Sequence, residues 1–418
     1  MRKLLVALMM VAFAATAFAA DVKFGGTYEF DGKYVSNYNG NGLTGDDDSV
    51  SGGFYEHDLD LWMQVNTDKD TFFKTKLELL DRTITGESGS DTAYKANTDF
   101  SVQRAWIGHN FGAVQIEAGL MDSGAWGYAF ADDAEGSYRV KATIPVAGGK
   151  LSILTQKKAE EFNTGVEDSE KDDADKYSIG YKGTFGGIMV APKLDYDINS
   201  NKDATIGGYD GKDNKVINFD LAVGGKFGAL SVETEFQYIA TTFADEVEGS
   251  REDFNVYGIY ANVGYKVGAA TIGFLTAYGS VSDDMPTKGF DFKDDFDSTF
   301  ILGDDMGVGG EGWTTGDQGG DLSGWWANAL YALYDVNDKL SLMAKFAYAT
   351  SNWDEDGVEN AVLDGATAWE FDASATYAIT KELSYYVNFG YAKVDLDVDG
   401  YDIDDPIMLV KHGLVLSF

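Results

Sequence analysis

The segment YEHDLDLWMQV (55–65), followed by NTDKD (66–70) and TFFKTKLELL (71–80), decides the fold. Within 55–65 the odd positions from Tyr55 to Val65 are mostly apolar, whereas Glu56, Asp58 and Asp60 occupy even positions. Successive residues of a β-strand point to opposite faces, so this alternation predicts a strand with one apolar and one polar face. The short polar stretch at 66–70 predicts a tight turn into a second, antiparallel strand.

The same alternation recurs along the whole chain. Apolar and polar residues alternate in the segments 22–34, 230–238, 257–265, 369–377 and 408–418. Such segments have about the ~9–11 residues that a tilted strand needs to cross the hydrocarbon of a bilayer. The chain contains only 4 Pro but 50 Gly, 24 Tyr and 26 Phe, which suits many paired strands with tight turns. Beyond the N-terminal segment no apolar run approaches the ~20 residues of a membrane helix.

The connections distinguish a membrane barrel from a soluble sandwich, because they switch between short turns and long acidic loops. That sorting places all the turns at one end and all the loops at the other, as in outer-membrane barrels. Nine long loops and eight short turns make seventeen connections and predict an all-β, antiparallel up-and-down barrel of 18 strands; losing one hairpin leaves 16. The least regular segments are 99–111, where neither face is clearly apolar, and 322–336, where both are. The predicted long loops are 35–53, 84–98, 122–136, 158–175, 199–214, 242–252, 281–321, 351–366 and 395–405.

The N-terminus predicts export. Arg2 and Lys3 precede an apolar run at 4–15, and Ala17-Phe18-Ala19 fits a small-x-small cleavage site. We therefore expect residues 1–19 to be a signal peptide and residues 20–418 to form one barrel domain. The chain has no cysteine, which excludes a lipid-anchored lipoprotein, a disulfide framework and a thiolate metal site.

The charge balance excludes one class of partner and suggests a selectivity. The chain has 32 Lys and Arg against 69 Asp and Glu, a formal net charge of −37. Nucleic acid is not an expected partner, because binding it needs a basic surface. The polar register of the strands carries an acidic set whose field would favour cations. That set is Glu56, Asp58, Asp60, Asp220, Glu233, Glu235, Glu370 and Asp372.

The residues give no support for catalysis, a resident metal or a cofactor. Of three histidines, His57 and His412 fall in the apolar register and His109 lies beside a short turn, so none forms a catalytic pair. The loops that begin at Asn352 and Asp395 start like calcium-binding loops, but Leu363 and Pro406 stand where a bidentate Glu is needed. We therefore expect no catalytic residue, no defined metal site and no cofactor, and only loose binding of divalent ions by the acidic loops.

Several aromatic residues are predicted to form interfacial belts. Trp325 and Trp326 beside the longest loop, and Tyr385 and Tyr386 near a short turn, fit the two membrane–water interfaces. Trp62 falls instead in the inward register, and a single ring gives little support for a sugar-stacking surface inside the barrel.

Two stretches resemble Gram-negative outer-membrane porins. The last strand ends in Phe418 with Leu416 and Leu414 on the same face, similar to the C-terminal strand of such barrels. The stretch 104–119, with Arg-Ala-Trp-Ile-Gly, then Phe-Gly-Ala-Val and Glu-Ala-Gly, resembles a porin hairpin. The resemblance implies recognition by the barrel-assembly machinery, an outer-membrane location among lipid and lipopolysaccharide, and a homotrimer.

The resemblance also implies a constriction. In such porins the third external loop folds into the lumen, where its carboxylates face a basic wall. By this analogy Asp132, Asp133 and Glu135 of loop 122–136 would face Lys74, Lys76, Arg139 and Lys141, with Arg104 as a further candidate; Glu233 and Glu235 belong to the acidic lining. This loop is shorter than in the porins it resembles, so the loop 281–321 is an alternative source of narrowing.

The function expected from these features is passive diffusion of ions and small polar solutes through a water-filled channel with a mild preference for cations. Two alternatives stay open. One is a substrate-specific channel for a sugar, an organic acid or a phosphate. The other is a structural or adhesive surface barrel with a plugged lumen.

Overall fold

In a computed structural model, the chain folds into consecutive β-strands. The structure describes residues 21–38, 50–84, 101–122, 126–131, 136–159, 174–199, 214–243, 252–284, 288–290, 292, 296, 298–302, 324–352, 364–395 and 405–418. Eighteen strands lie within these ranges: β1 (Asp21–Tyr38), β2 (Val50–Asn66), β3 (Thr71–Ile84), β4 (Ser101–Asn110), β5 (Gln115–Met121), β6 (Ser137–Val146), β7 (Gly149–Ala159), β8 (Ala174–Phe185), β9 (Ile188–Asn199), β10 (Asn214–Phe227), β11 (Leu230–Thr242), β12 (Phe254–Val267), β13 (Ala270–Gly279), β14 (Trp325–Asn337), β15 (Leu340–Ser351), β16 (Thr367–Ala378), β17 (Leu383–Asp395) and β18 (Ile407–Ser417).

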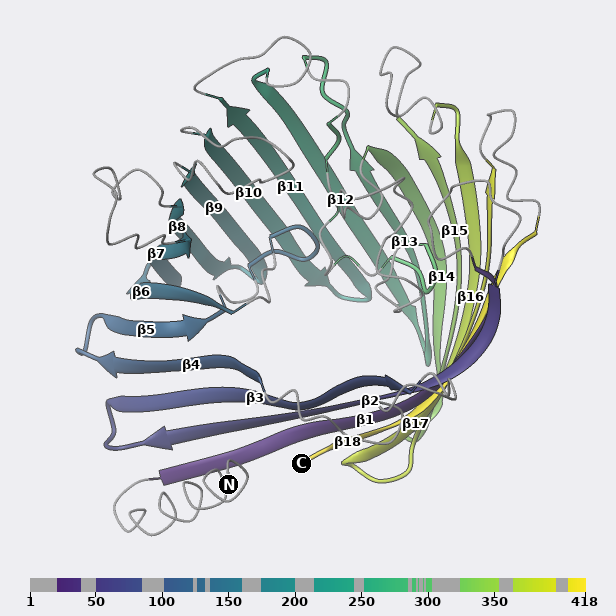
Figure 1. The fold of residues 1–418 in the computed structure, drawn as a ribbon, viewed down its shortest axis with the longest axis horizontal. Coiled ribbons are helices and arrows are strands. Elements are labelled where there is room, and N and C mark those ends of the chain that lie inside the picture. The colour runs from purple at the N-terminus through teal and green to yellow at the C-terminus, as the bar shows by residue number, and fades with distance from the viewer. Residues whose placement is uncertain are drawn as a thin grey trace, which may run out of the picture.

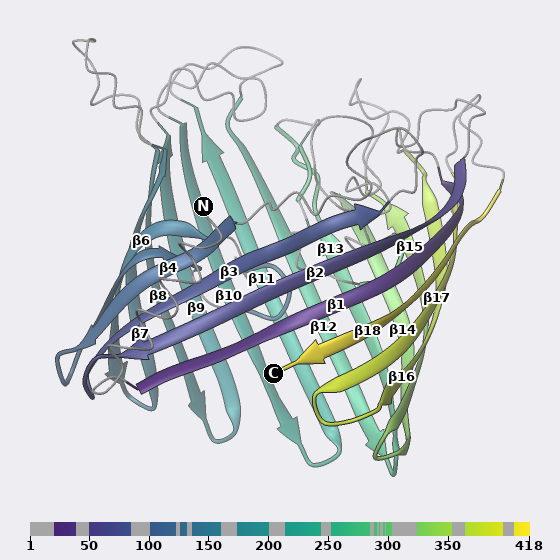
Figure 2. The same cartoon turned by 60° about the horizontal axis from the view of Figure 1, so that its bottom comes forward.

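The strands close into a ring. Each pairs antiparallel with the next along the chain, and β18 pairs with β1 (Figures 1 and 2). Beside this last pairing, the Phe418 N–H donates to the Gly26 carbonyl over 3.0 Å, and the Gly26 N–H donates back over 2.9 Å. A closed antiparallel sheet leaves no unpaired edge strand. The predicted 18-stranded barrel is confirmed, and the 16-stranded alternative is wrong.

Within the described ranges, no helix is long and apolar enough to cross a membrane.

The predicted alternation separates the two faces of the barrel wall. Large apolar side chains such as Phe24, Tyr138 and Leu330 are 62 %, 70 % and 60 % exposed, and they lie on the outer face. The polar register faces the lumen, where the buried residues include Asp220 and Glu235. His412 contacts the exposed outer ring of Tyr385, so its place in the apolar register agrees with the sequence pattern.

The short connections gather at one end of the barrel, which we call the turn end; the opposite end is the loop end (Figure 2). Between β6 and β7 the residues Ala147 and Gly148 both have positive φ, 42° and 77°. Two consecutive residues with positive φ suit a two-residue hairpin, because its twist matches that of the strands. Between β2 and β3, the backbone N–H groups of Asp70 and Thr71 donate to Asp68 and lower the pKa of its carboxyl.

In each of the two pairs expected to form the aromatic belts, only one residue faces outward, because consecutive residues of a strand point to opposite faces. Trp326 is 48 % exposed on the outer face, whereas Trp325 points inward and is 1 % exposed. Tyr385 is likewise on the outer face, whereas the Tyr386 hydroxyl donates inward to Glu29 over 2.7 Å.

Candidate functional site

Part of the loop between β5 and β6 lies inside the barrel. Trp126, Ala129 and Phe130 of this segment are 8 %, 2 % and 1 % exposed. In Figure 1 this part of the chain is the short blue piece within the ring of strands, near β9 and β10. The third long loop of the sequence therefore enters the lumen, and we call residues 126–131 the first inward segment.

A single carboxylate on β11 binds this segment. Glu235 of β11 accepts hydrogen bonds from four consecutive backbone N–H groups: Tyr128, Ala129 over 2.8 Å, Phe130 over 2.9 Å and Ala131 over 2.8 Å. Its side chain is 2 % exposed, so these N–H groups replace water as its partners. Hydrogen bonds to an ionised acceptor are stronger than neutral ones, and Glu235 therefore fixes the backbone of the segment in the lumen.

Further contacts fix the start of the same segment. The Trp126 indole N–H donates to the Ala191 carbonyl over 3.2 Å, and the Lys182 ammonium donates to the Trp126 carbonyl over 3.1 Å. Arg139 donates to the Met121 carbonyl over 2.7 Å, at the point where β5 ends. The Trp126 ring packs against Gly180, where a Cβ would overlap it. The segment is thus held by β8, β9 and β11.

A second inward segment comes from the long connection between β13 and β14, and we define it as the described residues within 288–302. Glu370 of β16 accepts hydrogen bonds from the N–H groups of Phe300, Ile301 and Leu302 over 2.9, 2.8 and 2.9 Å. The Lys345 ammonium donates to the Ser298 carbonyl over 2.6 Å. Glu370 is fully buried, and it repeats for this segment the role of Glu235 for the first.

The two inward segments meet through aromatic rings. The Phe130 ring lies 5.0 Å from Phe290, 5.6 Å from Phe292 and 5.9 Å from Phe296 between centroids. Tyr260 of β12 adds a further ring at 6.2 Å from Phe130. The sequence left open which loop narrows the lumen; both loops enter it and they contact each other.

The second inward segment explains why β14 is apolar on both faces. Trp325, Ala327 and Ala329 on its lumenal face are 1 %, 6 % and 3 % exposed. They belong to one apolar cluster with Phe290 and Phe292, so the inner face here packs against protein rather than water. Among the described residues, this part of the lumen is therefore filled by side chains.

The predicted basic wall lies on β3 to β6. Lys76 pairs with Asp60 over 2.5 Å, and Arg104 pairs with Asp122. Lys74 lies over the rings of Phe72 and Trp106 rather than beside a carboxylate. Lys141 lies directly opposite Glu117 of β5 in the strand register.

The predicted acidic residues are only partly within the structure. Asp132, Asp133 and Glu135 lie outside the described residues, as do the predicted signal peptide and most of the two calcium-like loops. Glu233 accepts a hydrogen bond from the Asn262 amide over 3.3 Å, and among the described residues it forms no hydrogen bond with the first inward segment. Glu235 is a tether for the segment rather than a freely hydrated lining group.

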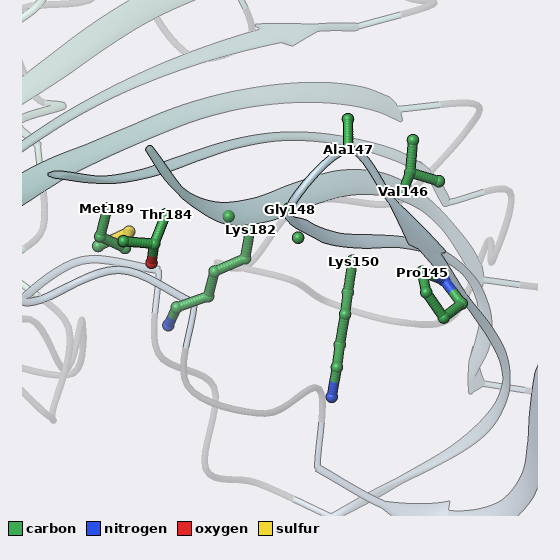
Figure 3. A pocket seen from close by; sticks show the side chains of 10 residues that line it. Pro145, Val146, Ala147, Gly148, Lys150, Lys182, Thr184 and Met189 are labelled. Carbon is green, nitrogen blue, oxygen red and sulfur yellow. The ribbon is translucent and has the colours of Figure 1, made fainter. Parts of the chain in front are cut away.

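The basic wall extends further than the sequence analysis expected. Lys176 and Lys193 both pair with Asp195, over 3.1 and 3.0 Å. At the turn end a hollow of about 610 Å³ is lined by Lys150 and Lys182, whose side chains extend to the same side of the wall (Figure 3). The period-2 pattern could have assigned all of these lysines to the lumenal register.

Sequence analysis also missed the aromatic residues of the inward segments. The signal was the apolar composition of Trp126–Ala131 and of the Phe290 and Phe292 pair inside otherwise polar, acidic loops. Within the described ranges, no group of three or more His, Cys, Asp or Glu could hold a metal ion.

Comparisons with known proteins place this geometry among known folds. A family model described as Gram-negative porin matches residues 5–397. No curated protein sequence matches the chain at a significant level. Among solved structures, the chain is similar to OccK2 (OpdF) of Pseudomonas aeruginosa, with a TM-score of 0.57, 10 % identity and coverage of 95 % of this chain and 98 % of that one. It is also similar to a BenF-like porin from Pseudomonas fluorescens Pf-5, with a TM-score of 0.56, 10 % identity and coverage of 95 % and 99 %. At these identities the likeness concerns the fold.

Proposed function

The chain belongs to the Gram-negative porin family, and from this premise we propose that it forms a narrowed, water-filled channel for passive diffusion of ions and small polar solutes. The family is one of outer-membrane channels, so the outer membrane is the site of action. The observation that carries the proposal is the pair of inward segments tethered by Glu235 and Glu370. They occupy part of the lumen, the first against β8, β9 and β11 and the second against β14 to β16.

The first test is conductance. Purified full-length protein in a planar bilayer should give current steps of roughly nanosiemens in concentrated KCl, as expected of a water-filled lumen narrowed but not closed. Protein that inserts, resists heat unfolding as a folded barrel and still gives no steps would favour the structural or adhesive alternative.

A mild preference for cations is a separate prediction. It rests on the excess of 69 acidic over 32 basic residues, which gives the mouth of the pore a negative field. Under a tenfold KCl gradient the reversal potential should have the sign of a cation-selective pore, and the preference should weaken as salt is raised because the field is screened. A reversal potential of the opposite sign would contradict the prediction.

A second candidate function is a substrate-specific channel for an organic acid. The observation that favours it is the run of lumenal Lys and Arg residues on β3 to β9, whose positive charge would attract a carboxylate. Such a channel would pass KCl and would in addition show a saturable, solute-dependent reduction of the current.

The cellular partners follow from the same proposal. We expect cleavage of residues 1–19 on export, insertion by the barrel-assembly machinery through the terminal strand ending in Phe418, contact with lipopolysaccharide and assembly as a homotrimer. We also expect no enzymatic activity, because a channel of this family acts by passage rather than by chemistry.

A further inference from the structure

We propose that Trp62, Phe72, Lys74 and Trp106 form a binding platform on the lumenal wall for a small organic anion that carries a flat-faced ring. The inference rests on the proposed channel function and names a class of solute for it. The platform belongs to β2, β3 and β4, at the turn end of the lumen and apart from the two inward segments.

The rings lie flat on the wall because glycines face them. A Cβ at Gly25 would overlap the Trp62 indole, and a Cβ at Gly108 would overlap the Phe72 ring. Gly25 and Gly108 are the cross-strand partners of Trp62 and Phe72 in the sheet register. Each ring therefore covers a glycine with one face and turns the other face away from the wall.

Trp62 keeps an open face toward the lumen. Its register partner on β3 is Lys76, which pairs with Asp60, and this lumenal row places Trp62 inside the barrel rather than on the outer face. Its side chain is nevertheless 46 % exposed, whereas inward-facing Trp126 and Trp325 are 8 % and 1 % exposed. A large ring open to water on the inner wall is available for stacking by a solute.

Lys74 supplies the charge. Its ammonium lies 5.0 Å from the centroid of Phe72 and 5.5 Å from that of Trp106. The Trp106 N–H donates to Glu117 over 3.1 Å, which fixes that ring. Among the described residues no carboxylate forms an ion pair with Lys74, whereas its neighbours Lys76 and Arg104 both have one. Within the described part of the chain, Lys74 is thus a cation that contacts two rings and forms no ion pair.

The combination selects for two features in one ligand. A flat ring gains by stacking on Trp62, and an anionic group on that ring gains by replacing water at Lys74. A neutral ring forms no ion pair with the Lys74 ammonium, and an anion without a ring does not stack on the Trp62 indole. An aromatic carboxylate and a sugar acid share this chemistry, since a sugar ring presents a flat C–H face.

The experiment measures reduction of the KCl current through single channels by four probes. Benzoate and glucuronate carry both a ring and a charge, acetate carries only the charge and glucose only the ring. We expect benzoate, glucuronate or both to reduce the current at concentrations where acetate and glucose do not. Trp62→Ala and Lys74→Gln should each raise the half-blocking concentration about tenfold, the order expected from losing one stacking or one charged contact.

The matched control is Lys226→Gln, which removes one lumenal ammonium from β10 at the same end of the barrel. It should leave the half-blocking concentration unchanged. Block by benzoate alone identifies an aromatic carboxylate, and block by glucuronate alone identifies a sugar acid. Equal effects of acetate, no effect of either ring anion, or block that survives both Trp62→Ala and Lys74→Gln would overturn the platform.

A second measurement separates this inference from the proposed function. Equilibrium dialysis of labelled benzoate and glucuronate against the purified barrel reports binding without any current. A barrel that gives no KCl steps but binds a ring anion in a Trp62-dependent way would overturn the channel and support the platform. A barrel that conducts KCl but binds neither ring anion would support the channel and overturn the platform.

Discussion

Glu235→Ala is expected to give a channel with higher conductance than the wild type, because the first inward segment loses its tether. Four backbone N–H groups between Tyr128 and Ala131 share this one carboxylate. Hydrogen bonds to a charged group contribute about 1.5–3 kcal/mol each, so even a net loss of ~4 kcal/mol would change the docked-to-undocked ratio about a thousandfold. The measurement is single-channel conductance in KCl, together with liposome swelling by sugars of increasing size.

The control for this variant is Glu233→Ala. It removes the same charge two residues away on the same lumenal face, but Glu233 accepts a hydrogen bond from Asn262 on β12 rather than from the loop backbone. The conductance of Glu233→Ala should therefore stay close to that of the wild type. If both variants changed conductance equally, the effect would belong to the charge of the lumen and not to the tether.

Phe130→Ala is expected to uncouple the two inward segments. The ring is 1 % exposed and contacts Phe290, Phe292 and Phe296, so its removal leaves a cavity where the segments meet. Truncating a buried Phe to Ala typically costs about 3–5 kcal/mol. We expect greater open-channel noise and a larger solute cut-off, with the strands still folded, since Glu235 and Glu370 each still bind their own segment.

Two comparisons make this second prediction specific. Phe346→Ala removes a ring that is 47 % exposed on the outer face, and it should leave the current noise unchanged. A double-mutant cycle of Phe130→Ala with Phe292→Ala should show a coupling energy of about 0.5–1.5 kcal/mol in unfolding measurements, as for other aromatic pairs. Strict additivity of the two variants would contradict contact between the segments.

Local sequence pattern predicted the wall of this barrel well. In β2 the even positions from Glu56 to Trp62 face the lumen, as the alternation indicates, because the side-chain period of a strand is two regardless of its neighbours. The strand number followed from the connections, because short turns and long loops can be recognised within a few residues. The residues that resemble porins pointed to the family that the comparisons then showed.

The least regular strands departed from a simple pattern for reasons outside themselves. In β14 the lumenal face is apolar because the second inward segment covers Trp325 and Ala327. In β4 the lumenal register holds Trp106, whose indole N–H is satisfied by Glu117 of β5. The second inward segment lies outside β14, and Glu117 lies outside β4. The sequence of either strand alone therefore could not have explained its pattern of apolar and polar residues.

The sequence by itself thus determined a closed, antiparallel barrel with a polar inner and an apolar outer face, since both depend on periods of two and on nearby turns. Only the tertiary structure decided what fills the lumen. Glu235 binds Phe130 across 105 positions of the chain, and Glu370 binds Phe300 across 70. Such contacts join a side chain on one wall to the backbone of a distant loop, and no local periodicity encodes the distance between them.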